Sequence, residues 1–163
     1  MKSGEILIRK AKKGDEGDVG RLLMQFWKDA EKRNPILKLK KNIGLRDYVN
    51  SAKKRLLQKK KNNFLFVAEI HEKIVGYLEF KVNNNIKYCQ TKKYGYLETT
   101  ATDKKFRKKG IASALINEAF KFLKKKGIFH VRALVSNKNN IARKAWAKVG
   151  FYDDSTLIQK NLK

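Results

Sequence analysis

The sequence predicts a single α/β (α+β) domain built on a mixed, mostly antiparallel central sheet with helices on both faces. Strand-like runs alternate with amphipathic helical stripes in the order β-α-α-β-β-β-α-β-α-β. Hairpin-length connections join the three strands before the central helix, so these strands are expected to be antiparallel. A strand-helix-strand unit over residues 94–135 makes the next pair parallel. No internal repeat and no Gly/Ser/Pro-rich linker divides the chain, so one domain is expected over residues 1–163.

The first third of the chain is expected to hold a short strand and two helices. The strand begins at Ile6–Ile8, and Asp15 opens a helix whose acidic first turn suits the helix dipole. Apolar residues at helical spacing mark its buried face, and Asn34-Pro35 ends it. A second helix is expected from Leu45 to Lys60.

The middle of the chain predicts a strand hairpin followed by the strand that leads into the central helix. Phe64–Glu69 and Ile74–Val82 are β-rich runs joined by a turn at His71-Glu72-Lys73. A polar loop then extends to Lys93, and Tyr94–Thr102 is again strand-like. These elements would form the antiparallel part of the sheet.

The last part of the chain predicts two helices that alternate with two strands. An amphipathic stripe covers Ile111–Lys126, and alternating apolar residues give a strand over Phe129–Val135. Asn139 or Asn140 caps a helix that Gly150 ends, and Ser155–Asn161 makes a final strand.

Composition indicates a cytoplasmic protein that does not span a membrane. No apolar run approaches the ~20 residues that a spanning helix needs. The start, Met1–Glu5, lacks the apolar core of a signal peptide, and the single Cys89 cannot form an internal disulfide. His71 and His130 do not have metal-ligand spacing, so no metal site is expected.

The net charge of +25 leaves two interpretations open. A strong basic excess is typical of proteins that bind polyanions such as nucleic acids. The excess is nearly all Lys, however, and it is spread along the whole chain without an RNA- or DNA-binding motif. Runs such as Lys59–Lys61 and Lys124–Lys126 are better explained as solvated helix ends.

The most informative segment runs from Arg107 to Ala112, between a predicted strand and a predicted helix. The first amides of a helix have no partner inside it, and the helix dipole adds partial positive charge there. A tight basic turn at this position predicts an anion site that suits phosphate groups.

Two motifs resemble those of the GCN5-related N-acetyltransferases, the GNAT superfamily. Arg107-x-x-Gly110-x-Ala112 is similar to the Arg/Gln-x-x-Gly-x-Gly/Ala motif of that family. Asn139-x-x-Ala142, on a helix that ends in Gly150-Phe151, is similar to a second family pattern. The predicted element order is also that of the family. The resemblance covers essentially the whole chain and is strongest over residues 64–151.

The resemblance implies a GNAT fold with a splayed parallel strand pair that binds acetyl-coenzyme A (acetyl-CoA) as cosubstrate. Backbone amides from Lys108 to Ser113 would wrap the pyrophosphate, and Gly110 lets the backbone approach it. The pantetheine arm would pair with residues 100–102, and an amide near Thr100 would polarise the thioester carbonyl. Asn139 would contact the cofactor, cap its helix, or do both. The cofactor residues implied are Thr100, Ala101, Thr102, Arg107, Lys108, Lys109, Gly110, Ile111, Ala112, Ser113, Asn139 and Ala142.

Glu98 is the candidate general base. An acceptor amine with a pKa of ~10.4 must lose a proton before it attacks. Strand alternation places Glu98 on the same side as Thr100 and Thr102, and Tyr96-Leu97-Glu98 is similar to the Tyr-Leu-Glu of polyamine acetyltransferases. The alternative is a strand glutamate paired with a neighbouring lysine.

The general acid is less clear, because Trp146 stands where the family usually has tyrosine. An indole N–H cannot protonate a thiolate, and Trp146 also suits core packing on its helix. Tyr152 or solvent would then protonate the leaving thiolate, which with a thiol pKa of ~8.5 is tolerable unaided.

The function implied is an N-acetyltransferase that moves acetyl from acetyl-CoA to a primary amine by direct attack in a ternary complex. The acceptor, which residues 26–62 and 83–95 would shape, is a protein or peptide α-amine, a lysine or a small amine. The alternatives are a catalytically impaired acetyl-CoA-binding module, favoured by Trp146, and a basic nucleic-acid-binding protein, favoured by charge alone. The sequence leaves open whether the protein is a monomer or a homodimer.

Overall fold

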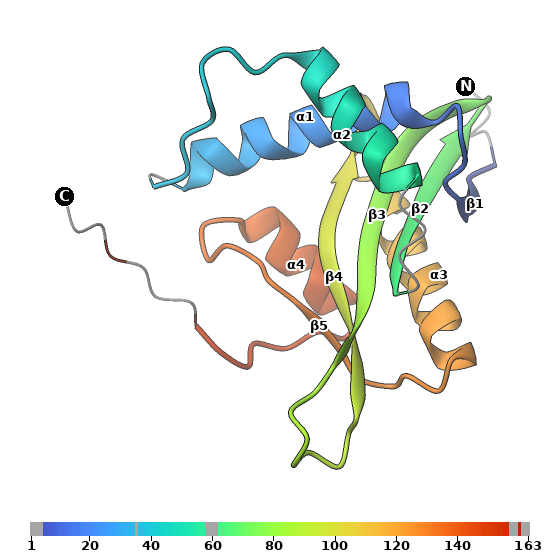
Figure 1. Cartoon of the computed structure of the whole chain (residues 1–163), viewed down its shortest axis with the longest axis vertical. Coiled ribbons are helices and arrows are strands. Elements are labelled where there is room, and N and C mark those ends of the chain that lie inside the picture. The colour runs from blue at the N-terminus through green and yellow to red at the C-terminus, as the bar shows by residue number, and fades with distance from the viewer. Residues whose placement is uncertain (1–4, 35, 58–61, 157–159, 161–163) are drawn as a thin grey trace.

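The computed structural model describes residues 5–34, 36–57, 62–156 and 160, which form an open sheet covered by helices on both faces (Figure 1). The five strands lie in the order β1-β2-β3-β4-β5, and all pairs are antiparallel except β4 with β5. In chain order the elements are β1 (Leu7–Lys10), α1 (Glu16–Arg33), α2 (Leu45–Leu57), β2 (Asn63–Ile70), β3 (Lys73–Asn84), β4 (Lys93–Thr102), a short 3₁₀ helix (Lys104–Phe106), α3 (Ile111–Lys125), β5 (Val131–Ala133) and α4 (Asn140–Lys148).

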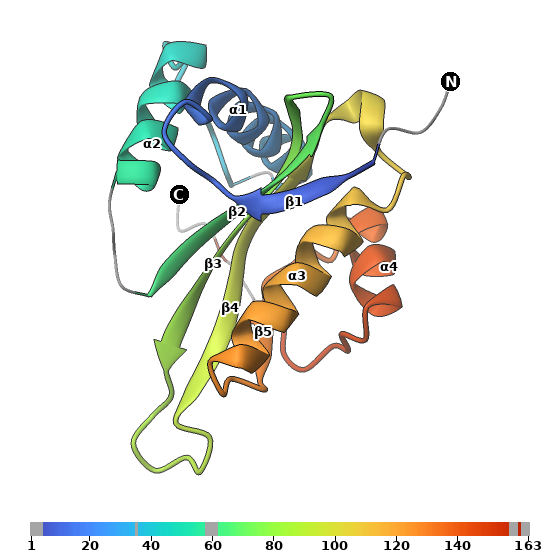
Figure 2. The ribbon, with the colours of Figure 1, turned by 90° about the vertical axis from the view of Figure 1, so that its right-hand side faces the viewer.

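The helices divide between the two faces of the sheet. Figure 2 has α1 and α2 on one face and α3 with α4 on the other. The core is accordingly split into two clusters, because alternate strand residues face opposite sides. The predicted fold class, a mixed, mostly antiparallel sheet with helices on both faces, is confirmed. No helix in the described part of the chain is both long and apolar enough to cross a bilayer.

The two parallel strands part soon after they meet. Their register runs only from Gly95 opposite Val131 to Leu97 opposite Ala133. Among the described residues, β4 then continues to Thr102 beside β3 alone, so its other edge has no described partner strand over residues 98–102. This is the splay that the family resemblance implied, and it leaves a strand edge without a described partner.

Two element boundaries differ from the sequence-based expectation, and a third lies partly outside the described residues. Strand β5 covers Val131–Ala133 and not Phe129–Val135, because β4 lies beside it over that short stretch only. The described end of α2 is Leu57, and the rest of the predicted helix lies outside the described residues, as does Pro35. Of the predicted strand at 155–161, the described residues 155, 156 and 160 are not strand, and the others lie outside the described part.

Candidate active site

The turn between β4 and α3 has a backbone shaped by two left-handed residues. Lys108 has a φ of 63° and Gly110 a φ of 76°. Left-handed backbone is strained for residues with a Cβ, and Gly110, which caps α3, avoids that strain. The helix then starts with a 2.9 Å hydrogen bond from the amide of Ala114 to the carbonyl of Gly110.

The amides that follow this turn are free to bind an anion. Within the described residues, no group accepts a hydrogen bond from the backbone N–H groups of residues 108–113. A Cβ added to Gly110 would meet no protein atom within 4 Å, so the space in front of the turn is open. Free amides at a helix N-terminus bind phosphate oxygens well, so these residues fit the pyrophosphate of coenzyme A. We call residues 107–113 the phosphate loop.

The side chains of the phosphate loop have different surroundings. Those of Lys108 and Lys109 are exposed, and their charge is available to an anion. Ile111 is 1% exposed and belongs to the core, so only its amide can serve a ligand. Ala112 and Ser113 are half-buried. Arg107 turns away toward α1, where its Nη2 lies 2.7 Å from Oδ2 of Asp29.

The open edge of β4 presents backbone groups of Thr100 and Thr102. The amide of Asp103 donates to the carbonyl of Val75 at 2.8 Å, so it points toward β3. Backbone direction alternates along an antiparallel ladder, so the amides of Thr102 and Thr100 point away from β3. The amide of Ala101 points toward β3, where its partner residue is Tyr77. Of the three residues predicted to pair with pantetheine, Thr100 and Thr102 therefore have the suitable direction.

Glu98 does not share a face with Thr100 and Thr102, and that part of the prediction is wrong. The register shifts from Glu79 opposite Thr99 to Phe80 opposite Leu97, which leaves Glu98 as an extra residue in β4. Such a bulge interrupts the alternation of side chains that the prediction assumed. Thr100 pairs with Leu78 of the α3-face core, whereas Glu98 bonds to Lys81 on the face of α1 and α2.

Glu98 is held by a lysine, as the alternative interpretation proposed. Its Oε1 lies 2.5 Å from Nζ of Lys81, and the same ammonium lies 5.4 Å from the centre of the Tyr96 ring. The hydrogen bond with Glu98 raises the pKa of Lys81. The Glu98 side chain is 27% exposed, so it remains accessible to a substrate or a water.

A second carboxylate on this face was missed by the sequence reasoning. Glu79 is 6% exposed and pairs with Arg55 of α2, while Oγ1 of Thr99 lies 3.1 Å from its Oε2. A lone carboxylate inside the apolar run Ile74–Val82 is the signal that could have found it. Arg55 and Thr99 both contact its Oε2, which fixes the carboxylate within the structure of this face.

The predicted residues of α4 and the segment after it have mainly structural contacts. Oδ1 of Asn139 accepts the amide of Ala142 at 3.2 Å, which is the expected helix cap. Trp146 packs edge-on against Phe151 with ring centres 5.0 Å apart, so its core role is confirmed. Tyr152 is 81% exposed and makes no hydrogen bond with Glu98 or Thr100. Its role as an acid stays a prediction.

A cavity of about 320 Å³ lies between α1, the connection after it and α2. Its walls are mostly apolar and include Leu23, Trp27 and Tyr48. The Tyr48 hydroxyl is buried without a partner among the described residues, and burial raises its pKa. This cavity falls within the region that the sequence assigned to the acceptor.

Comparison with known proteins gives the family. A model of the acetyltransferase (GNAT) family matches residues 23–151, so the chain belongs to this family. It is an acetyl-CoA-dependent N-acetyltransferase, as the resemblance implied. No protein of curated function matches the sequence.

Several solved structures share the fold. The aminoglycoside N-acetyltransferase AAC(6')-Iy in complex with CoA is 17% identical, with 98% of this chain and 96% of that chain covered and a TM-score of 0.76. A transcriptional regulator from Bacillus halodurans C-125 is 23% identical, with 97% and 100% covered and a TM-score of 0.76. An aminoglycoside acetyltransferase from a soil metagenomic sample, in complex with sisomicin, is 22% identical, with 97% and 95% covered and a TM-score of 0.65.

Proposed function

We propose that this protein acetylates a primary amine by direct attack on acetyl-CoA in a ternary complex, with Glu98 as the proton acceptor. The observation that carries the proposal is the position of the β4 bulge. It lies where the parallel strands part, next to the open edge at Thr100 and on the strand that leads into the phosphate loop. Cofactor groups and a carboxylate therefore meet on one strand.

Each group on this strand has a defined task in the reaction. The amides of residues 108–113 bind the phosphates, and the acetyl thioester supplies an activated carbonyl. The amide of Thr100 donates a hydrogen bond to the carbonyl oxygen and stabilises the negative charge that develops there. The amine nitrogen bonds to the carbonyl carbon, its proton passes to Glu98 directly or through a water, and the sulfur leaves as a thiolate.

Lys81 supports the proposed role of Glu98 by holding its carboxylate in place at the β4 bulge, with Nζ 2.5 Å from Oε1. The leaving thiolate takes its proton from Tyr152 or from solvent. Trp146 does not supply this proton, because an indole N–H cannot protonate a thiolate and its ring is packed against Phe151.

The acceptor that we propose is a small cationic amine. The carboxylate of Glu98 and the ring of Tyr96 hold the Lys81 ammonium, so these two groups could hold the ammonium of an acceptor that takes the place of Lys81. Several of the structural neighbours are named aminoglycoside acetyltransferases, and one was solved with sisomicin. A peptide α-amine or lysine is the other acceptor class, which the basic surface would attract if the peptide were acidic.

The test is thiol release from acetyl-CoA with a panel of amines: polyamines, aminoglycosides, and peptides with a free α-amine or lysine. We expect turnover with a small cationic amine. Glu98→Gln should lower kcat by about 10²–10⁴-fold with CoA affinity unchanged, as is usual for loss of a general base. Glu118→Gln on the exposed side of α3 is the matched control. Unchanged turnover in Glu98→Gln would remove Glu98 as the base.

The outcome that would contradict acetyl transfer is a protein that binds acetyl-CoA without turnover, an alternative that rests on the core position of Trp146. Calorimetry would then give CoA binding, while no amine would accelerate thiol release. Loss of CoA binding altogether would exclude both functions.

A further inference from the structure

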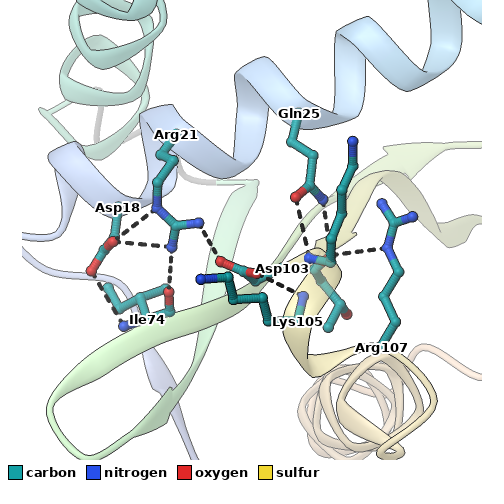
Figure 3. Close-up of polar contacts among 9 residues, drawn as sticks. Asp18, Arg21, Gln25, Ile74, Asp103, Lys105 and Arg107 are labelled. Carbon is teal, nitrogen blue, oxygen red and sulfur yellow. Dashed lines mark hydrogen bonds and ion pairs between the residues drawn. The ribbon is translucent and has the colours of Figure 1, made fainter.

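Arg21, Gln25 and Asp29 on one face of α1 contact the segment that joins β4 to α3. Figure 3 shows Arg21 and Gln25 with their partners. These α1 side chains recur every three or four residues, which is the helical repeat, so they form one line of contacts. We call Arg21, Gln25 and Asp29, together with Asp18, which pairs with Arg21 at 3.1 Å, the α1 clasp.

The first part of the clasp fixes the start of the connecting segment. Arg21 donates to the carboxylate of Asp103 and, at 3.0 Å, to the carbonyl of Ile74. Asp103 in turn accepts the amide of Lys105 at 3.0 Å, which begins the 3₁₀ helix. The amide of Asp103 also makes the last bond to β3, so beyond this point the sheet no longer holds the chain.

The middle of the clasp satisfies the open end of β4. Nε2 of Gln25 donates to the carbonyl of Thr102 at 2.9 Å, and its Oε1 accepts the amide of Lys104 at 3.3 Å. One amide side chain therefore bridges the strand and the 3₁₀ helix. The amide of Thr102 and both backbone groups of Thr100 remain for a ligand on that edge.

The last part of the clasp holds the motif arginine. Arg107 donates from Nη2 to Asp29 at 2.7 Å and from Nε to the carbonyl of Thr102 at 3.4 Å. Nζ of Lys104 lies 3.8 Å from the same Asp29 carboxylate. Partial burial opposes ionisation of Asp29, but the hydrogen bond and charge of Arg107 hold its pKa below the usual range.

We infer that Gln25 and Asp29 are positioning residues for acetyl-CoA, and that Arg107 acts as a strut to Asp29 and not as a phosphate ligand. The inference rests on the proposed role of the phosphate-loop amides. These amides follow Arg107 directly, so the place of Arg107 sets the direction in which they point. After Asp103 the sheet no longer holds the chain, and the α1 clasp holds the segment that leads into the phosphate loop instead.

The strut and the ligand interpretations predict opposite effects of removing Asp29. We expect Asp29→Ala and Arg107→Ala each to weaken CoA binding about fivefold, the upper range for a partly exposed ion pair. The double variant should bind no more weakly than either single variant, since both remove the same strut. Titration calorimetry with CoA measures all three, and Glu118→Ala is the control for loss of a surface carboxylate.

Two outcomes would overturn the strut. If Arg107 binds phosphate directly, Asp29→Ala releases its guanidinium and CoA affinity is unchanged or higher. If the two losses add in the double variant, Arg107 acts independently of Asp29. Thermal unfolding checks that each variant is folded, and Asp29→Asn, which keeps a hydrogen-bond acceptor, should recover part of the affinity.

A kinetic split separates positioning from a general structural defect. We expect Gln25→Leu to raise the KM for acetyl-CoA severalfold while kcat and the KM for the amine stay the same, since the chemistry is untouched. Equal losses in all three parameters would mean that Gln25 only stabilises the fold. Wild-type protein that fails to bind CoA would instead contradict the proposed phosphate loop, so the two failures are distinct.

Discussion

The two faces of the sheet bury different kinds of side chain. The α3 face buries an apolar cluster that includes Ile111, Leu115 and Leu123. The described polar residues that are buried all belong to the α1 and α2 face or its clasp; they are Asp15, Glu79, Thr99 and Asp103. Burying a polar group destabilises unless it is hydrogen-bonded, and each of these has a partner.

This difference indicates that the α3 face mainly stabilises the fold, whereas the α1 and α2 face also positions groups for chemistry. Apolar packing stabilises without direction, whereas paired charges fix orientation at a cost in desolvation. The same face carries Glu98 and contacts the segment that leads into the phosphate loop. Substitutions on the two faces should therefore have separable effects.

The largest loss of stability is expected on the apolar face. Leu115 is fully buried, and Leu115→Ala should lower the free energy of unfolding by about 2–5 kcal/mol through lost burial and a cavity. Chemical denaturation measures this, and CoA affinity of the folded fraction should stay the same. A changed CoA affinity with little loss of stability would contradict this division of roles between the two faces.

A smaller loss is expected from leaving a buried carboxylate without its partner. Arg55→Leu removes the charge that faces Glu79 and should cost about 1–3 kcal/mol in unfolding free energy. Adding Glu79→Gln should recover much of the loss, because the unpaired charge is gone. Lys54→Leu on the same helix controls for the change in surface charge; an equal loss there would contradict this reading.

Two glycines at opposite ends of α3 offer a sharper test. Gly110→Ala and Gly127→Ala each place a Cβ on left-handed backbone, at φ of 76° and 71°, with no protein atom within 4 Å of it. Each should cost about 1–2 kcal/mol of stability. Only Gly110→Ala should also weaken CoA binding, because only that end carries the free amides. Equal CoA affinities, measured by calorimetry, would argue against the phosphate loop.

The smallest effect concerns acid sensitivity. Burial opposes ionisation of Asp103, but the amide of Lys105 and the guanidinium of Arg21 hold the pKa of Asp103 below its usual value. The contribution to stability is thus full above the unfolded pKa of ~3.9 and is lost as the pH falls through the lower native value. Asp103→Asn should flatten this acid limb by about 1 kcal/mol, as for a partly exposed pair. Denaturation at pH 2–7 tests it, and an unchanged slope would exclude Asp103 as a source.

Much of the fold and the phosphate loop could be predicted because the signals are local. The stripe of α3, the cap at Asn139 and the turn at Gly110 depend on residues close in sequence. The core role of Trp146 also follows from its helical spacing. A short motif therefore predicts a short, self-contained structure well.

The face of Glu98, the length of β5 and the α1 clasp could not be predicted in the same way. The β4 bulge depends on the pairing register with β3, and β5 ends where β4 diverges. The contact between Asp29 and Arg107 joins residues 78 positions apart. Such features arise from tertiary arrangement, and a single sequence contains no local mark of them.

The bulge at Glu98 determines which face of the sheet the side chains of β4 reach. One extra residue acts as a phase shift in the strand, so residues before and after it face opposite sides. The strand can therefore present its open edge at Thr100 and, on the α1 and α2 face, the carboxylate of Glu98, without a loop between them. Deleting one residue here would leave the composition and length nearly unchanged, but it would move the side chains on one side of the deletion to the opposite face of the sheet.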